Sequence, residues 1–220
     1  MTTEDETFIA NLFFERYRVV LRRIPTSTEP TPDFELVDGD ERVAVVELKT
    51  LTYSPRTEEN GWKVTRDGPT MKATRTDNAP ARVGSLIYKA AKQLEGHATA
   101  KVLVILNLER LADVGDLHEA VEGPPMHVAR LSESGPELRI ALGTTKVARG
   151  RVSEAAHVPD LYFWVEPRKG PRLRFPAGMP AESVPGEAED AIWVRVVSET
   201  GLRLAERYFG LPSGFTGISF

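Results

Sequence analysis

The sequence of 220 residues contains no cysteine, which excludes disulfide bonds, thiolate metal ligands and cysteine nucleophiles. It has no apolar run approaching the roughly 18 residues that a membrane-spanning helix requires. The N-terminal stretch from Met1 to Glu6 is acidic and lacks the basic region that begins a signal peptide. We therefore expect a cytoplasmic protein without a membrane span.

The chain also lacks an excess of positive charge. Its formal net charge is −4, which argues against a protein that coats nucleic acid through charge alone. The four histidines show no metal-ligand spacing, and none adjoins a Gly-x-Ser-x-Gly nucleophile elbow. The segment Gly143-Thr144-Thr145-Lys146 lacks the glycine spacing of a phosphate-binding loop. With no ATP site evident, helicase or translocase activity would need a partner ATPase.

What the sequence does contain is typical of a soluble globular protein. Hydrophobic residues make up 41% and charged residues 27% of the chain, both ordinary values. The length is sufficient for one substantial core. We expect a single α/β domain over residues 1–220, with a core over about 8–108 and an extension over 109–220 whose structure the sequence does not define.

Two short apolar runs carry charged residues at their ends. Asp33 opens the first run, and Glu47 and Lys49 close the second. Residues two apart on a strand share a face, so the side chains of Glu47 and Lys49 point the same way. The turn sequence Asp38-Gly39-Asp40 predicts a hairpin between the runs. With residues 39–41 as the loop, Asp33 lies directly opposite Glu47, an arrangement suited to a hard divalent cation beside a cationic group.

The order Pro32-Asp33, a spacer, the apolar strand Val43–Val46 and then Glu47-Leu48-Lys49 resembles the core signature of the PD-(D/E)XK superfamily. These are the restriction-endonuclease-like nucleases. The resemblance covers roughly the first half of the chain, residues 8–108. It implies an α/β fold with a restriction-endonuclease-like core in the order α-β-β-α-β and a mixed central sheet flanked by helices.

The resemblance also implies roles for individual residues. Asp33 and Glu47 would be ligands of Mg²⁺ or Mn²⁺, with the backbone carbonyl of Leu48 as a third ligand. Lys49 would orient the attacking water and stabilise the scissile phosphate. Glu15 would add a further acid from the first helix, and Gln93 would support the site from a later helix.

Each of these roles has a structural alternative. Glu47 and Lys49 would otherwise form an exposed ion pair of little energetic value, although the apolar run around them favours a buried pair. Glu15 would otherwise be a boundary residue paired with Arg18 or Arg22. Lys89 and Gln93 would otherwise belong to a solvated helix face.

Hydrophobic periodicity predicts the elements around these motifs. We expect an amphipathic helix over 5–23, strands over 34–37 and 42–50, a helix over 81–95 and a continuously apolar strand over 101–108. The strand over 42–50, the helix over 81–95 and the strand over 101–108 then form a βαβ unit with parallel strands.

The predicted elements beyond residue 108 are less regular, and they are a helix over 109–121, strands over 137–142, 160–165 and 191–197, a loop over 166–190 and a closing helix over 200–208.

A long polar connection over 51–80 separates the hairpin from the helix over 81–95, and connections of this length are commonly functional or disordered. The segment 56–92 carries eight Lys or Arg residues against four acids, a difference of +4 that contrasts with the whole chain. Together with Trp62 and Tyr53 it predicts a basic surface able to stack on bases, with a flexible polar loop as the alternative. The predicted nucleic-acid contacts are Lys63, Arg66, Lys72, Arg75, Arg82, Lys89 and Gln93.

We therefore predict a metal-dependent nuclease that hydrolyses phosphodiester bonds in DNA, with RNA as an open alternative substrate. The rival prediction is a catalytically silent nucleic-acid-binding or assembly module on the same fold, such as a phage or defence-system component. A homodimer is a further expectation, because cutting two strands takes two sites. The strand over 191–197 and the C-terminal aromatic residues would supply either its interface or part of the core. A specificity subunit is another possible partner.

Overall fold

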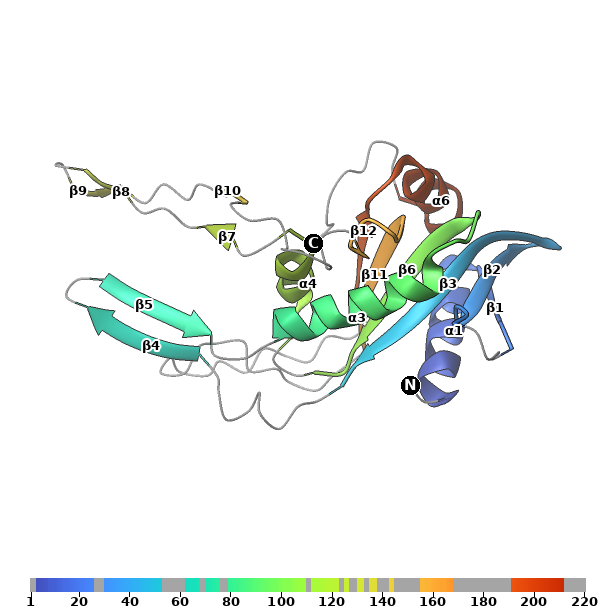
Figure 1. Cartoon of the computed structure of the whole chain (residues 1–220), viewed down its shortest axis with the longest axis horizontal. Helices are drawn as coiled ribbons and strands as arrows, with labels where there is room; N and C mark the ends of the chain where they lie inside the picture. Colours follow the sequence, from blue (N-terminus) through green and yellow to red (C-terminus); the bar gives the residue numbers. More distant parts are fainter. Residues whose placement is uncertain are drawn as a thin grey trace.

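The computed structural model shows an α/β architecture built on one open, mixed sheet (Figure 1). The side chains are described over residues 4–25, 30–52, 79–109, 112–122, 155–167 and 191–211. For Thr3 and for six further short strand segments the structure describes the backbone alone. Those strand segments are residues 62–67, 70–75, 125–126, 130–132, 135–137 and 143–144.

Six strands form the central sheet in the order β1-β2-β3-β6-β11-β12. Strands β3, β6 and β11 are parallel to one another, whereas β1, β2 and β3 pair antiparallel and β12 runs antiparallel to β11. Their bounds are β1 Val20–Arg23, β2 Phe34–Asp38, β3 Glu41–Leu51, β6 Ala100–Asn107, β11 Leu161–Glu166 and β12 Ala191–Val196.

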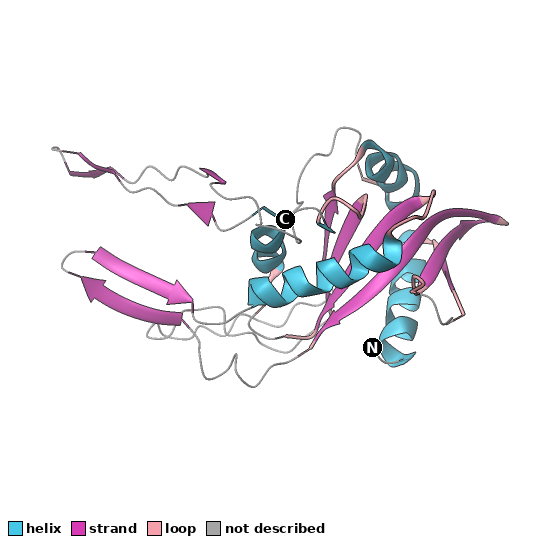
Figure 2. Cartoon of the chain, viewed as in Figure 1, coloured by secondary structure: helices cyan, strands magenta, loops and turns pink. Residues whose placement is uncertain are grey.

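Helices cover both faces of this sheet (Figure 2). Helices α1 (Thr3–Tyr17) and α6 (Glu199–Phe209) pack on one face, around Phe13, Phe163 and Phe209. Helices α3 (Ala79–Leu94) and α4 (Val114–Glu122) pack on the other face, around Trp164. The residues of β3, β6, β11 and β12 alternate between the two cores, as the two-residue period of a strand requires.

Several elements agree with the sequence-based expectations. Helix α3, the parallel pairing of β3 with β6, strand β11 and the closing helix α6 all lie where periodicity placed them. Strand β6 is buried on both faces because parallel neighbours flank it and helices cover it above and below. The sheet also continues past residue 108, where we expected the core to end, since β11 and β12 extend it.

The predicted helix over 5–23 is wrong in its last turn and a half. Helix α1 ends at Tyr17, Arg18 has a positive φ of 60°, and the chain re-enters as strand β1. Val19 and Leu21 still reach the same core as the helix does. Pairing of this β-branched segment with β2 overrides the helical spacing of its apolar residues.

The predicted connection over 51–80 contains a two-stranded hairpin that we did not expect. Strands β4 (Trp62–Asp67) and β5 (Thr70–Arg75) pair antiparallel, and the sequence Asp67-Gly68 is a hairpin signal.

Further along, α4 begins later than the expected helix over 109–121. The four remaining short strands are β7 Pro125–Met126, β8 Arg130–Ser132, β9 Gly135–Glu137 and β10 Gly143–Thr144. Most of the strand predicted over 137–142 and of the loop predicted over 166–190 lies outside the described residues.

Candidate metal centre

A β-bulge decides how the two acidic residues meet. The hairpin loop has two residues, since Asp38 pairs with Glu41, and the three-residue loop that we expected is therefore wrong. The register then shifts between Leu36 and Val37, which leaves Val43 without a partner in the ladder. The extra residue compensates for the shorter loop. Beyond the bulge Phe34 pairs with Val46, so Asp33 and Glu47 come next along the two strands and face each other as predicted.

Asp33 closes the open end of this ladder with its side chain. Its Oδ2 accepts a hydrogen bond of 2.8 Å from the backbone N–H of Leu48. The N–H and C=O of one strand residue point to the same edge, so the Leu48 carbonyl points toward the start of β2 as well. The residue opposite is Pro32, which has no N–H to donate. Pro32 therefore cannot donate a ladder hydrogen bond to the Leu48 carbonyl.

Glu47 and Lys49 lie on the α3 face of the sheet, between the buried residues Val45 and Leu51. The Glu47 side chain has 0% exposure and that of Lys49 has 18%. Lys49 Nζ donates to Glu47 Oε1, whereas Glu47 Oε2 is buried and accepts no hydrogen bond. The exposed ion pair considered as an alternative is therefore wrong, because the Glu47 side chain is buried. One of its two oxygens has no hydrogen-bond donor.

Gln93 on α3 contacts both strands of the cluster that Asp33, Glu47 and Lys49 form: Lys49 on β3 and the loop that precedes β2. Its Oε1 accepts a hydrogen bond of 2.7 Å from Lys49 Nζ, and its Nε2 donates to the Thr31 carbonyl at 3.2 Å. The ammonium of Lys49 is thereby held between a carboxylate and an amide. The same amide is attached to the loop that carries Pro32 and Asp33.

Burial raises the pKa of Glu47 from 4.5 to about 8. The ammonium of Lys49 opposes this shift in the pKa, and the carboxyl group of Asp33, within hydrogen-bonding reach of Glu47, adds to it. Two facing carboxylates cannot both be ionised without cost. A proton or a cation between them relieves that cost.

The oxygen atoms of this cluster fit a magnesium-type ion. Within the described residues there is no group of three or more Asp, Glu or His side chains placed to hold a metal. Mg²⁺ nevertheless keeps several waters and is commonly held by one or two carboxylates together with substrate phosphate. The candidate ligand oxygens are Oε2 of Glu47, which has no hydrogen-bond partner, the carboxylate of Asp33, and the Leu48 carbonyl that the resemblance implies.

Glu15 is separate from this cluster. It is exposed, and its helix α1 packs on the opposite face of the sheet from Glu47 and Lys49. The role in the site that the resemblance implied for Glu15 therefore has no geometric support. The acids of α1 that contact strands are in its first turn, where Asp5 accepts from Thr50 Oγ1 at 2.9 Å and Glu6 pairs with Arg23 at 2.9 Å.

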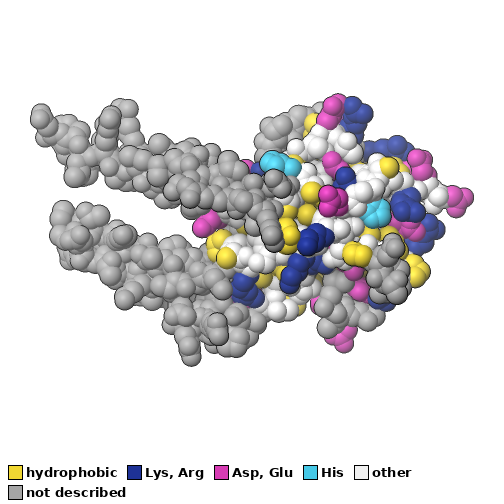
Figure 3. Space-filling model, viewed as in Figure 1, with side chains coloured by type: hydrophobic (Ala, Val, Ile, Leu, Met, Phe, Trp, Pro, Cys, Tyr) yellow, Lys and Arg dark blue, Asp and Glu magenta, His cyan; other side chains and the backbone are white. Residues whose placement is uncertain are grey.

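Apart from Gln93, which contacts Lys49 as described above, the predicted nucleic-acid contacts lie in three different settings. Arg82 donates to the Thr52 carbonyl and pairs at 3.0 Å with Glu109, which is 1% exposed, so it fastens the end of β3 rather than offering a charge to solvent. Lys89 is exposed on α3, one turn before Gln93. Several Lys and Arg side chains are visible on the face of the molecule that Figure 3 shows. The side chains of the other four predicted contacts lie outside the described residues. These are Lys63, Arg66, Lys72 and Arg75.

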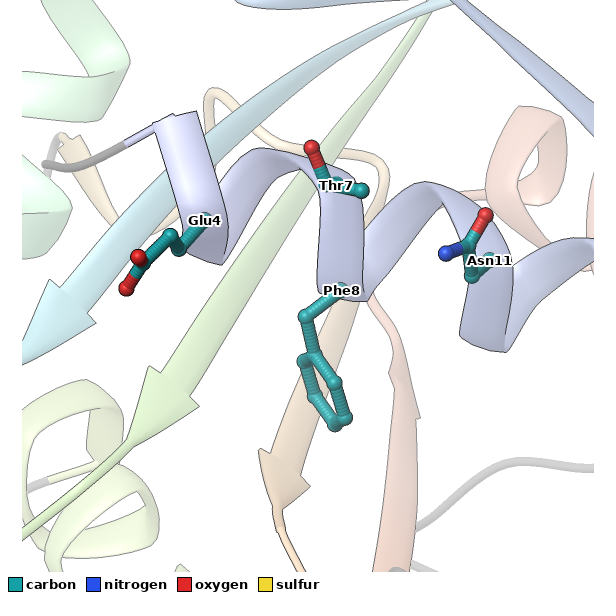
Figure 4. Close-up of a pocket in the computed structure, with 4 residues that line it drawn as sticks. All are labelled: Glu4, Thr7, Phe8 and Asn11. Carbon is teal, nitrogen blue, oxygen red and sulfur yellow. The ribbon is translucent and has the colours of Figure 1, made fainter.

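A shallow hollow lies away from the cluster, along α1. Glu4, Thr7, Phe8 and Asn11 line it (Figure 4), and all four belong to one side of a single helix. It brings together no pair of carboxylates and no cation, so it does not share the chemistry of the Asp33–Glu47 cluster.

Comparisons with protein-family models, with curated proteins and with solved structures give no match to this chain. In the part of the chain that the structure describes, no helix is long and apolar enough to cross a membrane.

Proposed function

We propose that this chain is a metal-dependent nuclease with a restriction-endonuclease-like core, and that its substrate is DNA. The observation that carries the proposal is the buried carboxylate of Glu47, which faces Asp33, is bound by Lys49 and has one oxygen without a donor. A buried charge with an unsatisfied atom costs stability. A pKa strongly raised by burial beside a specific charged partner is common at functional sites, which supports a functional role for Glu47.

The order of elements supports the same fold. Helix α1 is followed by an antiparallel hairpin, then by α3 and by β6 parallel to β3, which is the order that the resemblance implies, with β1 added at the edge. The cluster lies where β2 begins and where β3 passes beyond it. The carboxyl groups of Asp33 and Glu47 therefore meet at the start of β2, next to the backbone of Leu48.

Each residue of the cluster has a defined part in this proposal. Asp33, Glu47 and the Leu48 carbonyl hold Mg²⁺ or Mn²⁺, which when bound supplies Lewis acidity toward a phosphodiester and toward water. Lys49 places an ammonium donor beside the two carboxylates, where it orients the attacking water and stabilises negative charge on the phosphate. Gln93 fixes the position of that ammonium.

Nucleic acid as the substrate is supported by charge near the cluster. Lys89 and Lys92 are exposed on α3, and Lys92 lies over the ring of Tyr88 at 4.8 Å from its centre. Phosphate contacts of this kind give binding that weakens with salt. A partly buried aromatic ring beside a cation is also compatible with base stacking.

The decisive experiment is cleavage of labelled single-stranded, double-stranded and branched DNA, and of RNA, with Mg²⁺, Mn²⁺ or EDTA. Glu47→Gln and Lys49→Met are the test variants. Glu35→Gln is the matched control, because Glu35 is a β2 carboxylate already paired with Arg22 and Arg42. We expect metal-dependent cleavage that both test variants lower by about 10²-fold or more and that the control retains. Equal cleavage by all four proteins would exclude this site.

One observation favours a second function, a nucleic-acid-binding or assembly module without catalysis. Lys49 already neutralises one oxygen of Glu47, so the cluster retains a partner for its charge when no cation is present. This alternative predicts DNA binding that is unaffected by EDTA, and no cleavage of any substrate by folded wild-type protein.

A further inference from the structure

The two edges of the central sheet are built differently. The edge strand β1 has four residues, of which Arg22 and Arg23 form ion pairs with Glu35 and Glu6. Charged, short edge strands resist pairing with other strands. The opposite edge strand β12 is longer, with six residues of sequence Ala-Ile-Trp-Val-Arg-Val, and five of its six side chains are partly exposed. Its single charge, Arg195, is paired with Glu122.

The backbone groups at the β12 edge can be assigned from the ladder. Val197 N–H donates to the Asp160 carbonyl on the β11 side. Because successive residues alternate between edges, Ala191, Trp193 and Arg195 also point toward β11, and Ile192, Val194 and Val196 present their N–H and C=O groups to the outside. In the described part of the chain, no strand pairs with that outer edge.

We propose that two copies of this chain associate through β12, paired antiparallel about a two-fold axis at Val194, so that their two sheets become continuous. In this register Val194 pairs with its own counterpart, and Ile192 pairs with Val196 in both directions. Every outward backbone group of the strand then finds a partner, which removes the exposed edge.

The side chains that would lie opposite each other across the interface favour this register. Trp193 of one copy lies across from Arg195 of the other, in the closely spaced pairs between the hydrogen-bonded ones. A guanidinium beside an indole is a favourable cross-strand pair. Moving the axis to Arg195 would place two like charges directly opposite each other, which is destabilising. Moving it to Trp193 would leave Val196 outside the paired segment.

The absence of cysteine makes a direct test possible. Two Val194 Cα atoms in a hydrogen-bonded antiparallel pair lie about 5.5 Å apart, within the range that a disulfide spans. We expect Val194→Cys to form a covalent dimer under mild oxidation. The matched control is Val20→Cys, at the other edge, whose side chain is 49% exposed compared with 5% for Val194. Random collisions would therefore crosslink the control faster than the test variant.

Sedimentation equilibrium of the uncrosslinked protein completes the test. Wild type should be a dimer at micromolar concentration. Ile192→Pro should raise the dissociation constant of the dimer at least tenfold. The reason is that proline removes an outward N–H that does not pair with β11. Retained circular dichroism of this variant would show that the fold is intact. A monomeric wild type, or a Val20→Cys protein that crosslinks as readily as Val194→Cys, would overturn the proposal. Neither result bears on cleavage, since no metal or DNA is present.

Discussion

Two aspartates in this molecule occupy the same local position with different outcomes. Asp33 immediately precedes β2 and Asp160 immediately precedes β11, and each uses Oδ2 to accept a backbone N–H at 2.8 Å from a neighbouring strand. Each also accepts a backbone hydrogen bond through its own carbonyl from the strand on the other side. The shared device fastens the start of a strand between two neighbours.

The difference lies in the second carboxylate oxygen. At Asp160 that oxygen accepts from the Ser198 hydroxyl, which in turn caps α6 by accepting from Gly201 N–H at 3.1 Å. At Asp33 the neighbour is the buried carboxyl group of Glu47 instead of a donor. Both carboxylate oxygens of Asp160 therefore have a hydrogen-bond donor, so this aspartate stabilises the fold. Asp33 instead has a second carboxyl group beside it, an arrangement that favours the binding of a cation.

The largest effect on stability should come from filling the space between Gly201 and Asp160. A Cβ at Gly201 would lie 2.0 Å from the Asp160 carbonyl oxygen, so Gly201→Ala must displace α6 from the sheet. We expect a loss of about 3 kcal/mol or more in the free energy of unfolding. Gly39→Ala is the control, since nothing lies within 4 Å of its Cβ and only its φ of +61° is strained. It should cost about 1 kcal/mol. Equal losses in urea unfolding would contradict the packing at Gly201.

The next effect is a pH dependence of stability that arises where Glu47 faces Asp33. The pKa of Glu47 is about 8 in the folded chain and 4.5 as its ordinary value. The contribution of this group to stability is therefore complete below pH 4.5 and is lost as the pH rises through about 8. Each pKa unit corresponds to ~1.4 kcal/mol, so the rise from 4.5 to about 8 sets an upper limit of about 5 kcal/mol. Because Lys49 beside Glu47 is partly exposed to solvent, which screens the interaction, we expect a decline on the order of 3 kcal/mol in the free energy of unfolding of wild type.

Glu47→Gln should remove most of this decline, because the amide does not ionise. Thermal unfolding between pH 5 and pH 9 measures the change, and Mn²⁺ at pH 8 should raise the melting temperature of wild type but not of the variant. Wild-type stability that is independent of pH over this window would show that Glu47 does not titrate as the geometry requires.

Exchanging the two aspartates for alanine sharpens the comparison directly. Asp160→Ala removes acceptors for Lys101 N–H and for Ser198, so we expect a loss of roughly 2 kcal/mol in stability. Asp33→Ala removes one acceptor but also relieves the repulsion at Glu47, so its stability should change by less than about 1 kcal/mol. Cleavage should show the reverse order. If Asp33→Ala is the more destabilising variant in urea titrations, the assignment of roles is wrong.

The smallest effect separates two basic residues of α3. Arg82 is committed to Glu109 and to the Thr52 carbonyl, whereas Lys89 is exposed. Lys89→Ala should lower the slope of log affinity for DNA against log salt by about 0.9 and leave stability unchanged. Arg82→Ala should lower stability and leave the slope unchanged. Fluorescence anisotropy over a salt series distinguishes them, and identical slopes for the two variants would remove the case for α3 as a DNA contact.

Parts of the fold could be predicted because they depend on local patterns. The apolar run in β6 and the period of α3 are properties of short windows, and so is the Pro-Asp followed by Glu-x-Lys. The change at Arg18 from helix to strand could not be predicted in this way, because Val19 and Leu21 are apolar in both structures and only pairing with β2 selects one. The position of Glu15 away from the cluster could not be predicted for a related reason, since periodicity gives a helix face but not the side of the sheet that it covers.

The sequence by itself determined which groups are available: a proline without an N–H, two acids, a lysine and a chain without thiols. Their spacing of two along β3 also determined that Glu47 and Lys49 share a face. Only the tertiary structure decided that this face is buried beneath α3 and that Gln93 bridges Lys49 to Thr31. It also placed the bulge at Val43, which restored the Asp33–Glu47 register despite a shorter loop. The physical reason is that burial and long-range pairing set the charge of Glu47, and neither is a property of neighbours in sequence.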